Sequence, residues 1–207
     1  PLAYCQGGFY GGHLKPEEAI EPVLKSSTAS FGITALNELQ VLYNGKSIVE
    51  DGQFALDVMK YINKKTQEFK KEDHILYAIY GTPAESLCGL QIKQFRKKYG
   101  VIPGVSSREY VSNSFHCGVW EDITGIEKQD LEDRFWELFK GGRIQYVRYN
   151  LSYNTEAMIT YVERAMDKGF YEGVNLSLAY CNNCGHEELD MDVCPKCGSN
   201  DLVKIDR

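Results

Sequence analysis

No stretch of the 207-residue sequence approaches the roughly 20 apolar residues that a membrane-spanning helix needs. A secretory signal is also lacking, and the first residue is Pro1 rather than methionine. We therefore expect a cytoplasmic protein without a membrane partner, whose numbering begins inside a longer polypeptide or after processing. Internal repeats and low-complexity tracts are lacking too, and the balance of 43% hydrophobic and 25% charged residues is typical of a globular protein.

Basic residues are in deficit, 23 against 29 acidic ones, which gives a net charge of −6. A domain that binds duplex nucleic acid usually has the opposite balance, so we expect no nucleic-acid partner. The one basic cluster, Lys93 to Lys98, is interpreted as the solvated face of a helix.

Cysteine is the exception to this ordinary composition, with seven residues in the chain. An odd total that includes two tight pairs fits a reduced cytosolic protein better than a secreted, disulfide-bonded one. The three cysteines outside the pairs are scattered, and we interpret them as small buried hydrophobic residues. These three are Cys5, Cys88 and Cys117.

The two cysteine pairs have the spacing of a metal site. Each pair encloses two residues, a glycine follows each second cysteine, and nine residues separate the pairs. Glycine permits the positive φ that such a turn needs. A redox dithiol pair and a disulfide knot are the alternatives, but two turns of the same form favour a structural Zn²⁺ with no open coordination position. The predicted ligands are Cys181, Cys184, Cys194 and Cys197.

Hydrophobic periodicity predicts alternating strands and helices in the rest of the chain. Amphipathic helices are expected at Phe54–Phe69 and at Thr155–Lys168, the second capped by Asn154 and ended by Gly169. Strands are expected at three apolar runs, of which the second reads as covered on both faces; the three are Thr28–Ile33, His74–Tyr80 and Arg143–Leu151. This alternation predicts an α/β layer or barrel.

The residues after the second strand, Thr82-Pro83-Ala84-Glu85-Ser86, allow two interpretations. In the first, Thr82 is the N-cap of a helix and Glu85, three residues later, completes a capping box. In the second, the same loop lies at the carboxyl end of a parallel strand and offers free N–H groups to a phosphate. Local chemistry leaves both open.

Two longer motifs resemble the catalytic subunit of class III, or anaerobic, ribonucleotide reductase. Residues 80–87, Tyr-Gly-Thr-Pro-Ala-Glu-Ser-Leu, resemble its Thr-Pro-(Ala/Ser)-Glu-Ser motif. Residues 110–116, Tyr-Val-Ser-Asn-Ser-Phe-His, resemble its Tyr-Tyr-Thr-Asn-Ser-Phe-His motif. The cysteine pairs stand in the expected place, Ser30-Phe31-Gly32 matches an earlier segment, and the resemblance covers essentially the whole chain.

The resemblance implies the second half of a ten-stranded α/β barrel at residues 1–176 and a zinc ribbon at 177–207. The family reduces ribonucleoside triphosphates for DNA synthesis through a glycyl radical, which generates a thiyl radical on a cysteine loop inside the barrel. The family's radical glycine follows the zinc module and its thiyl cysteine lies upstream of the matched region. We therefore expect a C-terminal part of the subunit that is inactive alone.

The resemblance also assigns residues and partners. Residues Thr82 to Ser86 match the substrate-facing loop, where the phosphates are the expected ligands, and Glu85, Asn113 and His116 are candidates for a catalytic role. The expected partners are the ribonucleoside triphosphate, the remainder of the catalytic subunit, a second copy in a homodimer, and an activase that uses S-adenosylmethionine and an iron–sulfur cluster. The alternatives are a different glycyl-radical enzyme and a zinc-ribbon α/β module that docks a protein or nucleic acid.

Overall fold

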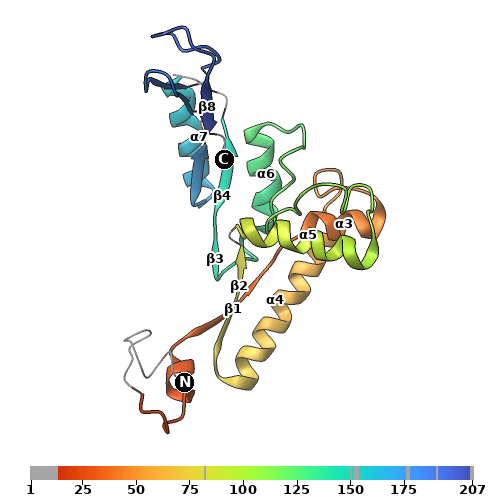
Figure 1. Ribbon diagram of the computed structural model, residues 1–207. Helices are drawn as coiled ribbons and strands as arrows, with labels where there is room; N and C mark the ends of the chain where they lie inside the picture. The colour runs from red at the N-terminus through yellow and green to blue at the C-terminus, as the bar shows by residue number, and fades with distance from the viewer. Residues whose placement is uncertain are drawn as a thin grey trace.

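The computed structural model describes residues 14–81, 83–149, 151, 154–175, 178–189 and 191–205. In this part of the chain, helices alternate with parallel strands, and a small antiparallel sheet lies near the C-terminus (Figure 1). The predicted α/β class is therefore confirmed. Cys5 and Thr82 lie outside the described residues.

The parallel strands follow one another across the molecule. Strand β1 (Thr28–Gly32) pairs with β2 (Leu76–Gly81), and β2 pairs with the short β3 (Gly142–Arg143). One residue after β3 comes β4 (Gln145–Arg148), which pairs in parallel with β5 (Glu172–Asn175). The predicted strand at 143–151 is thus divided, and its two parts join β2 on one side to β5 on the other.

Helices connect these strands, and a short helix precedes them. In chain order they are α2 (Glu21–Lys25), α3 (Leu36–Asn44), α4 (Gln53–Asp73), α5 (Glu85–Tyr99), α6 (Gly125–Trp136) and α7 (Thr155–Asp167). The helices predicted from periodicity are confirmed as α4 and α7. The predicted cap of α7 is confirmed as well, because the Asn154 side chain accepts a hydrogen bond from the Ala157 N–H at 3.0 Å and Gly169 has φ +68°.

Hydrophobic periodicity predicts no helix at residues 125–136, where α6 lies. Its buried face carries Gln129 and Glu132 beside Phe135 and Trp136. Polar residues on the inward face break the apolar stripe by which an amphipathic helix is found. The start signal was nevertheless present, because Thr124 and Glu127 form a complete capping box.

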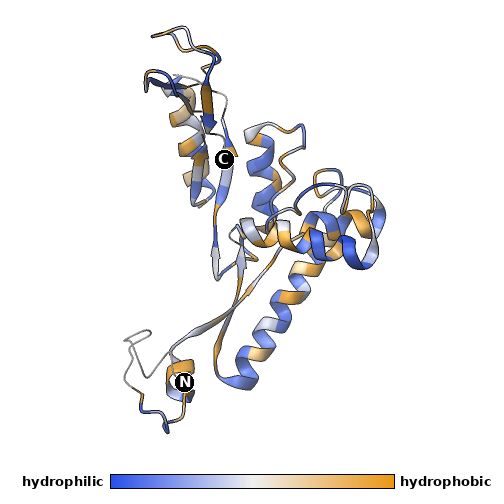
Figure 2. Ribbon diagram, viewed as in Figure 1, coloured by the Kyte–Doolittle hydropathy of each residue, from blue (hydrophilic) through white to orange (hydrophobic). Residues whose placement is uncertain are grey.

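Strand β2 is covered less than its sequence predicts. Only Ile79 and Gly81 are buried, whereas Leu76 and Tyr80 are 44% and 42% exposed. The long helix α4, which shows hydrophobic and hydrophilic bands in Figure 2, packs on β2. Since side chains alternate between the two faces of a strand, one covering helix leaves half of them outside.

The basic cluster at Lys93 to Lys98 was expected to be a solvated helix face, and Arg96 departs from this expectation. Arg96 turns back toward the chain, where its Nε donates to the Ser106 carbonyl at 2.5 Å and its Nη2 donates to the Arg108 carbonyl. This arginine therefore fixes the loop after α5 instead of standing in solvent.

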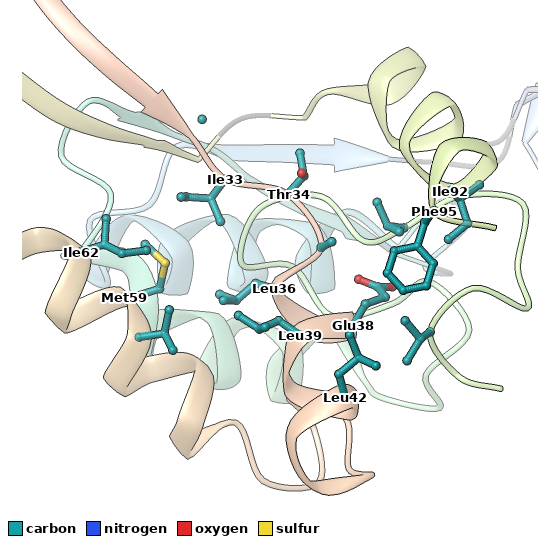
Figure 3. A pocket seen from close by; sticks show the side chains of 15 residues that line it. Ile33, Thr34, Leu36, Glu38, Leu39, Leu42, Met59, Ile62, Ile92 and Phe95 are labelled. Carbon is teal, nitrogen blue, oxygen red and sulfur yellow. The ribbon is translucent and has the colours of Figure 1, made fainter. Parts of the chain in front are cut away.

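Aromatic rings form the centre of the core. Phe115, Phe135 and Phe139 are fully buried, and they belong to one cluster with Ile79 and Met59. An apolar cavity of about 430 Å³ lies beside this core, between α3, α4 and α5 (Figure 3). Its lining is mostly aliphatic.

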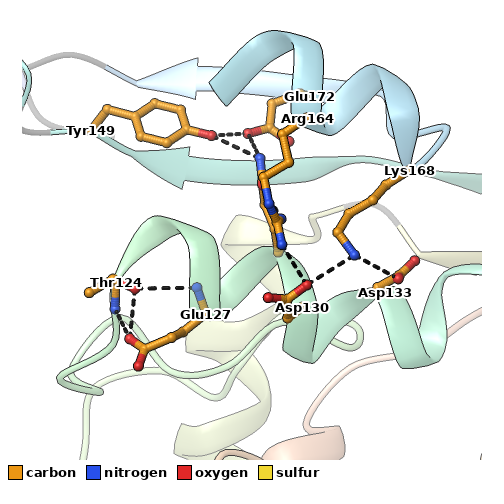
Figure 4. Close-up of polar contacts among 9 residues, drawn as sticks. Thr124, Glu127, Asp130, Asp133, Tyr149, Arg164, Lys168 and Glu172 are labelled. Atoms are coloured by element: carbon orange, nitrogen blue, oxygen red, sulfur yellow. Dashed lines mark hydrogen bonds and ion pairs between the residues drawn. The ribbon is translucent and has the colours of Figure 1, made fainter. Parts of the chain in front are cut away.

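A polar network attaches α7 and β5 to α6 (Figure 4). Arg164 donates to Asp130 at 2.7 Å, and Lys168 contacts Asp133 at 2.9 Å. The hydrogen bond from Arg164 lowers the pKa of Asp130. Deeper in the same interface, Tyr149 donates to Glu172. This network fixes the position of α6, whose other residues line the cavity described below.

Gly81 of β2 packs closely against the aromatic rings of the core. A Cβ at Gly81 would lie 2.6 Å from the Phe139 ring, whereas a Cβ at Gly32 on the neighbouring strand would meet nothing within 4 Å. Because inserted atoms in a packed core cost about 1–3 kcal/mol, we expect Gly81→Ala to lower the free energy of unfolding by that amount. Gly32→Ala is the matched control, and equal urea midpoints for both variants would contradict this packing.

Candidate functional site

The two motifs that stand out in the sequence lie against each other in the structure. The Asn113 side-chain oxygen accepts a hydrogen bond from the Ala84 N–H at 2.8 Å and lies 3.0 Å from the Cys88 sulfur. Asn113 thus holds the loop after β2 at the point where α5 begins. Its described contacts are those of a positioning residue.

A tight turn directs the side chains of the second motif to different neighbours. The His116 N–H donates to the Asn113 carbonyl at 3.0 Å. Between them, Ser114 has φ +48°, a left-handed conformation that costs energy for a residue with a Cβ. Such strain persists where the surrounding contacts determine the backbone, as the contacts of Asn113 and His116 do here.

His116 belongs to a buried cluster of ionisable groups. Its Nδ1 lies 2.9 Å from Oε2 of Glu132, and Oε1 of the same carboxylate accepts the Cys117 N–H at 3.2 Å and lies 2.6 Å from Lys128 Nζ. Burial by itself raises the pKa of Glu132, but the Lys128 ammonium and His116 hold it below its ordinary value. The carboxylate is therefore ionised, and the stability that it contributes is lost as the pH falls through its lowered pKa.

His116, Cys117 and Lys128 line a cavity of about 380 Å³. It lies where the loop after β2 and the carboxyl ends of β4 and β5 meet, the edge of a parallel sheet at which ligands usually bind. Its wall combines aromatic, amide and charged side chains, the mixture expected of a small-molecule site. Among the lining residues are Pro83, Tyr110, Asn113, His116, Trp120, Glu121, Lys128, Tyr146, Arg148 and Asn175.

The two described cysteines of the scattered set are buried, as predicted. Cys88 is 1% exposed and Cys117 is 5% exposed. Burial raises the pKa of the Cys117 thiol to about 12, and burial also raises that of Cys88. At neutral pH both are thiols rather than nucleophilic thiolates.

The capping interpretation of residues 82–86 is wrong. Helix α5 begins at Glu85, not at Pro83, and its N-cap residue, Ala84, makes no side-chain capping bond. Glu85 is thus the first residue of the helix and not the third after the cap, and its side chain lies outside the described part of the structure. Pro83 lines the cavity and Ser86 is exposed.

Two functional candidates, Glu132 and Lys128, are not predicted from the sequence. Both come from α6, the unpredicted helix, where they stand four residues apart on one face. A Lys–Glu pair at this spacing is common on solvated helices, so the sequence holds no sign that this pair is buried. The pair belongs to the buried cluster only because the turn at His116 brings the imidazole against Glu132.

The four predicted metal ligands converge near the C-terminus. Strand β6 (Leu178–Cys181) pairs with β7 (Glu187–Leu189) and β8 (Leu202–Ile205), and this sheet supports the cysteine turns. The ligand sulfurs of Cys181, Cys184, Cys194 and Cys197 lie within 4.8 Å of one another.

The backbone of both turns and the hydrogen bonds to Cys197 suit a bound cation. The glycines after the two second cysteines, Gly185 and Gly198, have φ +71° and +72°, as their positions predict. Hydrogen bonds from the Asn183 side chain and the Ser199 backbone lower the pKa of Cys197 to about 6. A thiolate is the form that binds metal, so this arrangement is compatible with zinc.

A family of known proteins matches this sequence, and it is the family that the two motifs resemble. The family described as anaerobic ribonucleoside-triphosphate reductase matches residues 1–207. The chain belongs to this family.

Named relatives show how much of such a protein the chain represents. The anaerobic ribonucleoside-triphosphate reductase of Haemophilus influenzae is 30% identical over 99% of this chain and 31% of its own length. That of bacteriophage T4 is 31% identical over 99% of this chain and 34% of its own length. The chain thus spans about a third of these reductases.

Solved structures show the same fold. The anaerobic ribonucleotide reductase from Thermotoga maritima with glycerol in the active site aligns with a TM-score of 0.66 and 18% identity, over 86% of this chain and 31% of that one. Another anaerobic ribonucleotide reductase gives a TM-score of 0.69 over 87% of this chain. Within the described residues, no helix has the length and apolar character to cross a membrane.

The role of Asn113 is testable by stability. Asn113→Ala leaves the Ala84 N–H without its acceptor, so we expect a loss of about 1–3 kcal/mol in the free energy of unfolding. Asn113→Asp keeps an acceptor oxygen at the start of α5 and should recover most of this loss. Chemical denaturation measures both, and an alanine variant as stable as the parent would contradict the positioning role.

The cysteine cluster predicts one bound metal ion. We expect about one equivalent of zinc per chain by elemental analysis, and Zn–S distances near about 2.3 Å by X-ray absorption. Cys194→Ser should lose the metal and unfold the β6–β7–β8 sheet, because metal binding supplies folding energy to such small modules. Cys88→Ser, outside the cluster, is the control. A disulfide between Cys181 and Cys184 would contradict the metal site.

Proposed function

We propose that this chain forms the substrate-holding, C-terminal part of an anaerobic ribonucleotide reductase. The enzyme reduces ribonucleoside triphosphates to deoxyribonucleotides by glycyl and thiyl radical chemistry. The observation that carries the proposal is the contact between Asn113 and the Ala84 N–H, which joins the two family motifs at the edge of one cavity. The family match over the whole chain supports it.

The described strands support a half-barrel at residues 1–176. The pairs β1–β2, β2–β3 and β4–β5 are all parallel. If β3 and β4 are taken as one strand, helices connect each strand to the next. Strand β1 has a neighbour on one side only among the described residues. In the proposed barrel of ten strands, the remainder of the catalytic subunit continues the sheet.

Residues 177–207 form the proposed zinc ribbon. Its described part has an antiparallel sheet and a hydrophobic cluster of its own, which contains Ala179 and Met191. Four sulfur ligands would fill the tetrahedral sites of Zn²⁺ and leave none for water, so the ion is structural. In the proposed enzyme, the ribbon positions the segment that carries the radical glycine.

The loop at residues 82–86 is the proposed substrate site. Helix α5 begins there, and its N-cap residue Ala84 makes no side-chain capping bond, which favours an anionic ligand at the first N–H groups of the helix. Pro83 places this loop on the cavity wall. The triphosphate of a ribonucleotide is the proposed ligand, with Glu85 and His116 as the residues able to hold or move a proton.

The proposed partners follow from the same assignment. They are the ribonucleoside triphosphate, the rest of the subunit in a cytoplasmic homodimer, and the activase that installs the glycyl radical with S-adenosylmethionine and an iron–sulfur cluster. A binding module that uses the ribbon to dock nucleic acid fits less well, because the acidic residues Glu187, Glu188 and Asp192 lie between the two cysteine pairs in the sequence.

Anaerobic assays decide between these functions. We expect the full-length polypeptide that contains this chain to reduce ribonucleoside triphosphates after treatment with its activase, and to show a glycyl radical by electron paramagnetic resonance. The 207-residue chain alone should show neither, because it spans only about a third of the length of the named reductases. Turnover by the chain alone, or radical formation without ribonucleotide reduction in the full-length protein, would refute the assignment.

A further inference from the structure

The ring of His116 has one nitrogen engaged and one unused. Its Nδ1 lies 2.9 Å from Oε2 of Glu132, so Nε2 stands on the opposite edge of the ring. His116 is 8% exposed, and Nε2 is buried without a hydrogen-bond partner among the residues that the structure describes. A buried polar atom without a partner is costly. Since His116 also lines the cavity of about 380 Å³, a ligand group there would supply the missing partner.

The contacts of Glu132 decide which ring nitrogen carries the hydrogen. Both oxygens of the carboxylate face donors: Oε1 accepts the Cys117 N–H at 3.2 Å and lies 2.6 Å from Lys128 Nζ, and Oε2 faces Nδ1 of His116. An ionised carboxylate can only accept, so Nδ1 is the nitrogen that bears the hydrogen. In the neutral ring, Nε2 therefore carries the lone pair and is a hydrogen-bond acceptor.

The surroundings of the ring favour this neutral form. With a hydrogen on Nδ1 alone, the charges of Lys128 and Glu132 cancel and the cluster carries no net charge. A second proton on Nε2 would place a positive charge on a buried atom and create a donor without an acceptor among the described residues. The rings of Phe115 and Tyr146 pack around the imidazole, with centroids 4.6 Å and 6.3 Å from it, and hold its orientation.

An uncharged donor suits this nitrogen. The balanced cluster has no surplus negative charge to attract an ammonium group, and a buried atom is reached best by a small group. A hydroxyl meets both conditions, because it is neutral and its O–H rotates toward a lone pair. The aromatic side chains of Tyr110, Trp120 and Tyr146 and the polar groups beside them form the mixed wall that a polar organic molecule needs.

We propose that neutral His116 accepts a hydrogen bond at Nε2 from a hydroxyl group of the ligand in this cavity. The carboxylate of Glu132 holds the Nδ1–H and thereby sets the tautomer, since the bond made by one ring nitrogen determines the state of the other. That the hydroxyl belongs to a ribose rests on the function proposed above, whereas the acceptor role of Nε2 does not.

The tautomer of His116 is measured without any ligand. In the ¹⁵N-histidine-labelled 207-residue chain at about pH 8, we expect hydrogen on Nδ1 of His116 and none on Nε2. The spectrum of His116→Asn identifies the His116 signals among those of the four histidines, and the exposed His74 is the internal reference. Hydrogen on Nε2 at this pH, in the other tautomer or in an imidazolium, would overturn the proposal.

Nucleotides that differ by one hydroxyl test the ligand. CTP, 2′-deoxy-CTP and 3′-deoxy-CTP are titrated by calorimetry into the full-length protein that contains this chain. CTP should bind about 5- to 30-fold more tightly than the analogue that lacks the bonded hydroxyl, because that analogue leaves Nε2 unpaired. The analogue that loses affinity identifies the hydroxyl. Equal affinities for all three nucleotides would overturn the proposal.

Substitutions then assign this preference to Nε2. His116→Asn keeps an amide donor near the Nδ1 position and removes the acceptor, so its affinity ratio between CTP and the same analogue should fall to about one. His116→Gln brings an amide oxygen near the Nε2 position and should keep a higher ratio than His116→Asn. A purely structural His116 would weaken the binding of all three nucleotides equally, and the ratio of the parent would then persist in His116→Asn.

His74→Asn is the matched control, because asparagine tolerates the left-handed backbone at His74, where φ is +56°. This variant should keep the affinity ratio of the parent. A ratio that falls equally in His74→Asn and in His116→Asn would contradict a specific role of His116.

The outcomes distinguish this inference from the proposed function. If the protein reduces ribonucleotides and His116→Asn keeps the affinity ratio of the parent, the role of His116 is refuted and the function stands. If the ratio depends on His116 in a protein that does not reduce ribonucleotides, the function is refuted and the hydroxyl site stands.

Discussion

The turn from Asn113 to His116 is the constraint on which the rest of the site depends. Its backbone hydrogen bond and the left-handed Ser114 fix the directions of two side chains. Asn113 reaches the loop after β2, and His116 reaches Glu132 on α6. A single short turn thus ties together the loop after β2, the start of α5 and the inner face of α6, beside the cavity.

The aromatic core sets this turn in place. Phe115, in the middle of the turn, is fully buried and packs at a tilt against Phe139, while Gly81 leaves room for both rings against the sheet. Because protein interiors pack densely, the turn cannot shift without displacing these rings. The polar network between α6 and α7 adds a second anchor, so the carboxylate that receives His116 is itself held in position.

Much of this architecture could be predicted from the sequence, for physical reasons that are specific to each element. Helices α4 and α7 have strong apolar stripes, and the cysteine turns have a spacing that only a few chemistries use. Helix α6 could not be found in the same way, because its inward face carries Gln129 and Glu132. Their partners, such as Tyr149 and His116, lie at sequence separations that no local pattern encodes. The predicted start of α5 at Pro83 was wrong because capping preferences describe only neighbouring residues. In the structure, the side chain of Asn113, 29 residues away, accepts a hydrogen bond from the Ala84 N–H.

Stability alone does not account for the ionisable groups on this cavity wall. A buried ion pair gains little over well-packed apolar residues of similar size, since the loss of hydration offsets the attraction. Here Lys128 and His116 share the carboxylate of Glu132, and Nε2 of His116 has no hydrogen-bond partner among the residues that the structure describes. An apolar cluster would fold as well and would need no partner. A ligand group that pairs with this nitrogen would remove the imbalance.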